Sequence, residues 1–333
     1  MPFSPAHFCS FCIQKALRLL LLLIAVAALS YTLVNVSPID PVDAYLGPAV
    51  LKVSPEQRDI ISQRWGLDQP PVERFLRWGA QLVQGDFGVS TIFNEPVLTV
   101  IGKRFATSFW LMLLAWSISG IAGFMLGVLA GTYENRTADK LIGMYAYTMA
   151  STPTFWVGMV LLSIFSIHLG WAPVGLAWPV GLSPEEATLG QRIHHLILPA
   201  VTLSFIGTAQ IALHTREKTI KAMHSDYAQF ARAQGESEIG IAFRHALRNV
   251  ALPAITLQFA SLGELFGGAV LAEQVFSYPG LGMATVEAGY RGDIPLLLGI
   301  VLFSTVFVFT GNTVADILYR IIDPRMRPAE EAA

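Results

Sequence analysis

Residues 105–132 read FATSFWLMLLAWSISGIAGFMLGVLAGT, a run of 28 residues without one charged side chain. A helix needs roughly 20 mostly apolar residues to cross a bilayer, so this stretch predicts a membrane-spanning helix. Five further stretches, at about 16–36, 141–169, 196–213, 250–272 and 295–319, meet the same requirement with hardly a charge among them. We therefore expect an all-α integral membrane protein with about six transmembrane helices.

The composition points to the same class. Of the 333 residues, 53% are hydrophobic and only 14% are charged, whereas about 25% of the residues in a soluble domain are charged. The net charge of −2 offers no basic face for nucleic acid, and we expect none as a partner. The two cysteines, Cys9 and Cys12, are too few for a four-ligand zinc site or a disulfide framework.

The apolar stretches divide the chain into three parts. Residues 1–36 form an inner tail and the first helix, residues 37–104 a periplasmic helical segment, and residues 105–333 a five-helix core. A cleaved signal peptide is the alternative for the first stretch, because Lys15 and Arg18 precede its apolar run. An even number of spans puts both termini on one side, and the distribution of Lys and Arg over the short loops makes that side the cytoplasm.

The long outer segment carries signals for two helices between residues 54 and 84. Ser54 and Gln57 have the spacing of a capping box with Pro55 at the first helical position, Gly66 offers a stop, and Pro70-Pro71 separates a second helix. The second helix has one apolar face, made of Val72, Phe75, Leu76, Gly79, Leu82 and Val83. We expect this face to pack on the membrane helices; a docking surface for an external partner is the alternative.

Small residues recur at every fourth position of the second span, at Ser119, Gly123, Gly127 and Gly131. Such a ridge lets two helix backbones approach closely in lipid. The pattern predicts a tightly packed bundle and says little about what that bundle does.

No catalytic motif emerges from the chain. Gly102-Lys103 lacks the spacing of a Walker A loop, and neither a Gly-x-Ser-x-Gly elbow nor a His-Glu-x-x-His pair is present. His194-His195 is a conceivable metal site, but adjacent helical residues point in different directions and no carboxylate or thiol is near in sequence. We therefore expect no enzyme, no metal site and no cofactor in this chain.

Residues 214–249 are mixed in charge and Ala-rich on both sides of Gly235, and the topology places them in the cytoplasm. The other expected inner loops are short, so the length of this one calls for an explanation. A contact site for a soluble cytoplasmic protein accounts for it better than a structural cap, which stays the alternative.

This segment reads DYAQFARAQG at 226–235 and HALRN at 245–249. It resembles the coupling segment of permease subunits in the peptide/nickel ABC importer family, whose usual pattern is DYxRTARAKG followed by HALRN at the same spacing. Gln229, Phe230 and Gln234 depart from that pattern and put in doubt which ATPases would fit. Further resemblances lie at 37–41, 66–70, 85–90, 276–282, 293–295 and 323–325.

The resemblance implies one of two homologous permease subunits in a bacterial inner membrane. Its partners would be two ATPase subunits, which bind ATP and magnesium, and a substrate-binding protein outside the membrane. The substrates of the family are peptides or nickel and metal chelates. The residues expected to couple this chain to the ATPases are Asp226, Tyr227, Ala231, Ala233, Gly235 and His245.

Glu264 is the one acidic residue well inside an expected span. It either hydrogen-bonds across the permease pair or lines the translocation path, since a charge in lipid is costly. Gly263-Glu264-Leu265 followed by Gly267-Gly268 is somewhat more similar to nickel-type permeases than to dipeptide ones.

The rival class is a stand-alone secondary transporter or channel, which predicts several polar groups within the spans and broken helices in mid-membrane. A membrane enzyme is a distant third, because no acid–base pair or metal cluster is apparent.

Overall fold

The computed structural model describes residues 5–36, 41–46, 53–64 and 69–322. Within them the regular structure is helical, and the only β pairing is a single bridge between Val89 and Pro96. The predicted all-α class is therefore confirmed. The helices fall into two compact units, one from Met1–Thr107 with Gly280–Phe309 and the other from Ser108–Pro279 with Thr310–Ala333.

Four of the described helices are long and apolar enough to cross a membrane unbroken. These spans lie in α1 (Pro5–Val36), α5 (Val97–Thr132), α8 (Leu189–Met223) and α14 (Ile294–Ile322). The number rises to six if each of two bent helix pairs counts as one span.

The two remaining predicted spans, 141–169 and 250–272, are not continuous helices. The first consists of α6 (Thr137–Ala150), α7 (Thr154–Leu161) and the π-helix η2 (Leu162–His168), with a bend of 109° between its halves. Pro153 precedes α7 and disfavours helical backbone at the residue before it, which explains this break. The second bends by 52° between α11 (Leu247–Ala260) and α12 (Leu262–Val275).

The first unit contains α1, α2 (Pro41–Leu46), α3 (Pro55–Arg64), α4 (Pro71–Val83) and α13 (Leu281–Tyr290), together with parts of α5 and α14. Both helices predicted between residues 54 and 84 are thus present. The capping box precedes α3: the Gln57 amide donates to Ser54 Oγ (3.3 Å), and the Ser54 amide donates to Gln57 Oε1 (3.2 Å). The predicted stop at Gly66 lies outside the described residues.

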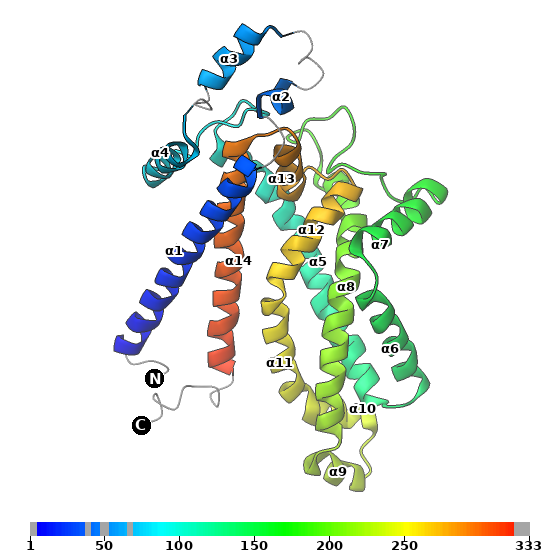
Figure 1. Cartoon of the computed structure of the whole chain (residues 1–333). Helices are drawn as coiled ribbons and strands as arrows, with labels where there is room; N and C mark the ends of the chain where they lie inside the picture. Colours follow the sequence, from blue (N-terminus) through cyan, green and yellow to red (C-terminus); the bar gives the residue numbers. More distant parts are fainter. Residues whose placement is uncertain (1–4, 37–40, 47–52, 65–68, 323–333) are drawn as a thin grey trace. The chain divides into compact units, whose positions relative to one another are not determined.

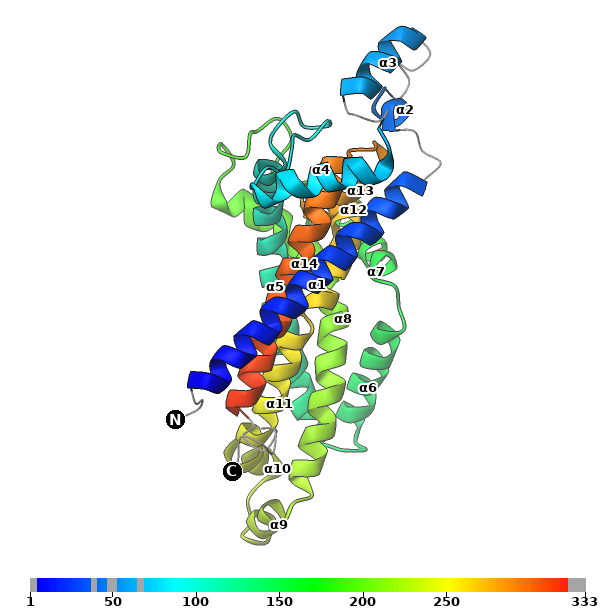
Figure 2. The ribbon, with the colours of Figure 1, turned by 60° about the vertical axis from the view of Figure 1, so that its left-hand side comes forward.

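The apolar face of α4 packs only along one edge. Phe75 lies against Tyr31 of α1, with ring centroids 5.0 Å apart, and Figures 1 and 2 both show α4 beside the end of α1. Val72, Leu76 and Val83 are 69%, 65% and 89% exposed. The expectation that the whole face packs on membrane helices is therefore wrong for these three residues within this chain.

The buried carboxylate of Asp293 joins the loop before α5 to the start of α14. Asp293 is fully buried, and its Oδ2 accepts hydrogen bonds from Ser90 Oγ (2.6 Å) and the Ile92 amide (3.1 Å). Its Oδ1 accepts from the Leu296 amide in the first turn of α14 (3.1 Å). Two pieces that lie far apart in the sequence, 85–90 and 293–295, are thus joined at one side chain.

The second unit is built around α8, which contacts α6, α7, α11 and α12 (Figure 1). This helix packs so closely against α5 that only glycine fits at the contact positions of α5. A Cβ on Gly127 would lie 2.5 Å from Thr215 Cβ and 2.6 Å from the Ala212 carbonyl oxygen. Gly123 and Gly131 meet α8 in the same way, so the predicted ridge of small residues is confirmed as a helix–helix contact.

The ridge gives a direct test on one helix. Gly127→Ala forces α5 and α8 apart, because one of the clashing atoms belongs to the backbone of α8, and we expect a loss of about 1–3 kcal/mol in stability. Gly102→Ala, also on α5, is the matched control, because nothing lies within 4 Å of its added Cβ. Thermal unfolding of the two purified variants in detergent measures the difference; equal melting temperatures would contradict the close contact.

Candidate functional site

The 214–249 segment forms one end of the second unit. It continues from α8 into α9 (Asp226–Ala233), α10 (Glu238–Ile241) and the short π-helix η3 (Ala242–Ala246), and then enters α11. Figure 1 shows α9 and α10 at the end of α8 and α11 that is remote from α7 and α12.

Local sequence sets both ends of α9. Ser225 has the extended backbone of an N-cap residue, and Asp226 puts a negative charge in the first turn, where the helix dipole favours it. At the other end Gly235 adopts a φ of +85°, which side-chain-bearing residues rarely tolerate. Its amide donates to the Arg232 carbonyl oxygen (3.0 Å). The predicted break at Gly235 is therefore present, as the C-terminal turn of α9.

One face of α9 is buried in a hydrophobic cluster, which we call the end cluster. Its buried members come from α5, α8, α9, α10, η3 and α11, and they are Val128, Met223, Ala228, Ala231, Ile241, Ala242, Ala246 and Val250. Ala228 is fully buried and Ala231 is 4% exposed. Ala231 thus packs within this chain and does not lie on the exposed face of α9, and its expected role in coupling stays a prediction.

The opposite face of α9 is exposed to solvent within this chain. Asp226, Tyr227, Phe230 and Ala233 are exposed, with Phe230 at 67% and Tyr227 at 38%. Tyr227 and Phe230 are three residues apart and therefore share a side of the helix. Aromatic residues are enriched in the cores of protein–protein interfaces, so this face suits a protein partner. In the sequence, Phe230 stands out only as a departure from the family's usual pattern. Nothing there predicts that its side chain is exposed.

Side-chain contacts hold α9 to α10, and η3 to the turn between them. The Arg232 guanidinium donates to both carboxylate oxygens of Glu238 (2.7 and 2.9 Å), and this hydrogen bonding raises the pKa of Arg232 above its ordinary value. His245 Nε2 lies 3.2 Å from Glu236 Oε1. His245, predicted to contact a partner, is therefore already engaged within the segment.

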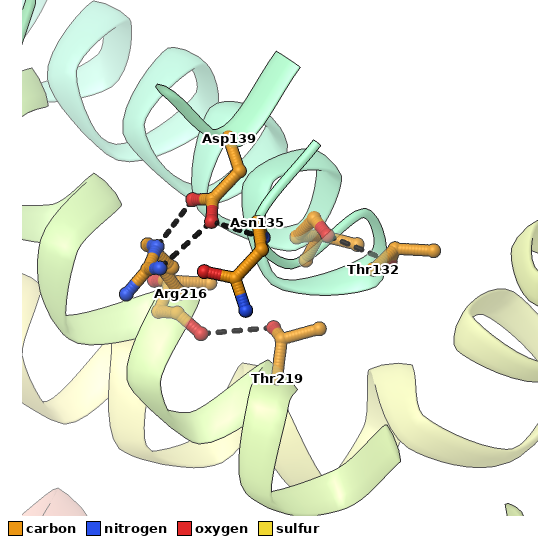
Figure 3. Close-up of polar contacts among 7 residues, drawn as sticks. Thr132, Asn135, Asp139, Arg216 and Thr219 are labelled. Atoms are coloured by element: carbon orange, nitrogen blue, oxygen red, sulfur yellow. Dashed lines mark hydrogen bonds and ion pairs between the residues drawn. The ribbon is translucent and has the colours of Figure 1, made fainter. Parts of the chain in front are cut away.

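A buried ion pair fixes the same end of α8 to α6 (Figure 3). Arg216 binds both oxygens of Asp139, with Nη2 2.8 Å from Oδ2, and the Asn135 amide donates to Oδ2 (2.8 Å). Asp139 is 4% exposed. A buried carboxylate without partners would be strongly unfavourable, so this pair defines how α6, α8 and the turn between α5 and α6 fit together.

Two acids on α12 differ in their surroundings. Glu264 lies in the first turn, just after the bend, and is exposed within this chain. Glu273 is fully buried, and its Oε1 accepts a hydrogen bond of 2.5 Å from Ser108. Glu264 is therefore not buried in the bundle of its own chain. Glu273 was missed because it lies one residue beyond the predicted end of the span at 272.

His194 and His195 bind backbone rather than each other. His194 Nε2 donates to the Trp171 carbonyl oxygen (2.9 Å), and His195 Nδ1 donates to that of Gly175 (2.9 Å). Their ring planes are 76° apart. The described part of the chain brings no three His, Cys, Asp or Glu side chains together as metal ligands.

Comparison with known proteins gives consistent matches. Residues 123–328 match the family described as "Binding-protein-dependent transport system inner membrane component". An oligopeptide transport system permease protein of Bacillus subtilis is 33% identical over 318 residues, covering 95% of this chain and 99% of the relative. A glutathione transport system permease protein of Escherichia coli K12 is 34% identical over 319 residues, covering 96% and 99%. A putative peptide permease protein of Brucella ovis is 33% identical over 95% of this chain and 98% of the relative.

Two alanines on α9 form a matched pair for testing the orientation of this helix. Ala231→Glu buries a carboxylate in the end cluster, at a cost of several kcal/mol, and should loosen residues 214–249. Ala233→Glu puts the same side chain on the exposed face and should leave stability unchanged. Limited proteolysis and thermal unfolding of both variants check this. Equal loss in the two would mean that α9 does not pack on the face described.

Proposed function

Because the chain belongs to the family of binding-protein-dependent transport system inner membrane components, we propose that it is one of two permease subunits of an ATP-driven importer, and that α9 docks into one of two ATPase subunits. Membership makes it a multi-pass membrane permease rather than an enzyme. The single observation that carries the docking proposal is the exposed pair Tyr227 and Phe230 on a helix whose other face is buried.

The packing of α9 supports a mechanical role. ATP and magnesium would bind in the ATPase subunits, and closure of those subunits would move the helix that they hold. Since α9 shares the end cluster with α5, α8 and α11, a displacement of α9 would pass to these helices as a movement of packed elements. Switching between two packings of the spans would then give alternating access.

The proposed orientation places both termini and the 214–249 segment in the cytoplasm. It rests on the excess of Lys and Arg in the segments assigned to that side. A substrate-binding protein would deliver its cargo to the opposite side of the membrane, where α3 and α4 would lie.

We propose peptides as the substrate class. The relatives reported above are an oligopeptide permease, a glutathione permease and a putative peptide permease. They favour peptides over nickel, although the residues around Glu264 are somewhat more similar to those of nickel-type permeases. The binding protein would make most of the selection among peptides.

A stand-alone transporter is the competing function. The broken helices that it predicts are present at the α6–α7 and α11–α12 bends, so that feature does not separate the two classes. The exposed aromatic face of α9 does favour the importer, because a transporter that works alone needs no docking surface of this kind.

Phe230→Ala tests the docking proposal. Loss of an aromatic anchor from the centre of an interface costs about 2 kcal/mol or more in binding free energy, so we expect weaker co-purification of the ATPase subunits and slower ATP-driven peptide uptake by vesicles.

Phe243→Ala is the matched control, since Phe243 is 50% exposed in the same segment but lies outside α9. Unchanged ATPase retention and uptake in Phe230→Ala would overturn the proposed contact. A purified chain that transports without any ATPase would favour the stand-alone class.

We also propose that Glu264 lines the translocation path. It is exposed within its own chain, and a carboxylate on a membrane helix is costly when it faces lipid. Glu264→Gln keeps the size and hydrogen bonding of the side chain and removes its charge, so uptake of a lysine-containing peptide should slow more than uptake of dialanine. Equal rates for both peptides, or loss of complex assembly, would count against a role in passage.

A further inference from the structure

The helix α4 presents an exposed apolar face within the described part of the chain. At 3.6 residues per turn, Val72, Leu76 and Val83 lie within about 40° of one another around the helix axis, and all three are largely exposed. No residue of α4 is buried. A group of exposed apolar side chains marks a place where a protein contacts another protein or a membrane. We therefore asked what covers this face.

The other side of α4 is polar and belongs to the interior of the first unit. Arg74, Arg77 and Gln81 line a cavity there, together with residues of α1, of the loop at 89–94 and of the start of α14. Arg74 Nη2 donates to Asn35 Oδ1 of α1 (2.7 Å). These contacts fix the rotation of α4 about its own axis, so its apolar face points away from the cavity.

Contacts with α1 also set the depth of α4 in the membrane. Besides the bond from Arg74 to Asn35, Phe75 packs on Tyr31 with the ring centroids 5.0 Å apart. Asn35 and Tyr31 belong to the last two turns of a membrane-crossing stretch that ends at Val36, within about 8 Å of its end. The headgroup region on each side of a bilayer is about 5–8 Å thick. The helix α4 therefore meets α1 at the depth of the membrane interface.

The direction of α4 and the aromatic rings around it suit the same depth. In Figure 1 α4 is seen nearly along its axis, whereas α1 runs lengthwise in the view, so α4 lies crosswise to this span. An interfacial helix lies in the plane of the membrane in this way. Phe75 contacts Trp78 as well as Tyr31, with the Phe75 and Trp78 centroids 5.9 Å apart. Tyr and Trp are enriched where a membrane meets water.

A lipid surface fits the apolar face of α4 better than a protein partner does. A stable protein interface uses roughly 20–30 residues on each side, whereas this face offers three large apolar side chains. The neighbouring span is itself exposed on several sides, because the successive residues Leu20, Leu21 and Leu22 of α1 are all exposed although they point about 100° apart. Such a span borders lipid, and α4 lies at its end.

We propose that α4 is an interfacial anchor that binds the surface of the phospholipid bilayer. Val72, Leu76 and Val83 insert at the boundary between headgroups and acyl chains. No particular headgroup is required, because Arg74 and Arg77 lie on the side of the helix that lines the cavity. This inference rests on the family's place in the membrane and depends neither on the peptide substrate nor on docking by α9.

Spin labels on α4 test the anchor in the whole complex, reconstituted into phosphatidylcholine nanodiscs. In a chain whose two native cysteines are replaced by serine, the label is placed at Val83 or at the next residue, Gln84, which is also exposed but points about 100° away. Relaxation of the label by oxygen, which dissolves among acyl chains, is compared with relaxation by water-soluble chromium oxalate.

The ratio of oxygen relaxation to chromium oxalate relaxation should be several-fold higher at Val83 than at Gln84. Equal ratios at the two positions would place the apolar face in water. Protection of the Val83 label from both reagents would place this face in a protein contact. Either result would overturn the proposal.

Two substitutions with the same new side chain test whether the apolar face itself holds the helix in the membrane. Leu76→Asp should lower the ratio at the Val83 label several-fold, because a carboxylate opposes insertion into lipid. Gln81→Asp adds the same carboxylate on the polar side of α4 and should leave the ratio unchanged. Both positions are exposed, so neither change should disturb folding. An unchanged ratio in Leu76→Asp, or an equal fall in both variants, would contradict the anchor.

Discussion

The contact between α5 and α8 is the constraint on which the second unit depends. At Gly127 and Gly131 the two backbones are so close that a methyl group would fall within 2.9 Å of the facing helix. The Asp139–Arg216 pair secures the same end of α8 to α6. Together these contacts hold in place the end of α8 from which α9 continues. Local sequence sets the ends of α9, and packing in the end cluster sets which of its faces is buried.

That arrangement gives the proposed coupling a physical route. Only one face of α9 is available to a partner, because the other closes the end cluster against Val128, Met223 and Val250. A force applied to Phe230 would act on α5, α8 and α11 through side chains that are already close-packed. Protein interiors transmit strain because they have few voids. The Arg232–Glu238 ion pair ties α9 to α10, and the His245–Glu236 contact ties η3 to the turn between them.

Patterns in the sequence predicted those structural features that depend on neighbouring residues or on a long periodic repeat. The apolar stretches, the capping box at Ser54 and the glycine ridge all correspond to described features. The bend at Pro153 was missed because hydropathy averages over a window and hides one residue. The direction of Ala231 could not be read either, since α9 has only 8 residues and its alanines suit both faces. Glu273 and the Ser90–Asp293 contact depend on partners distant in sequence, which no local pattern reveals.

The proposed coupling requires above all that α9 and the helices it caps move as one body. Spin labels at Ala233 on α9 and at Met125 on α5, which is 50% exposed, measure this directly in a chain whose two native cysteines are replaced by serine. The distance distribution between the labels should be the same in the nucleotide-free and ATP-bound complexes, while ATP-driven uptake is retained. A distance that changes with nucleotide would show that α9 moves independently of the bundle and would contradict the account.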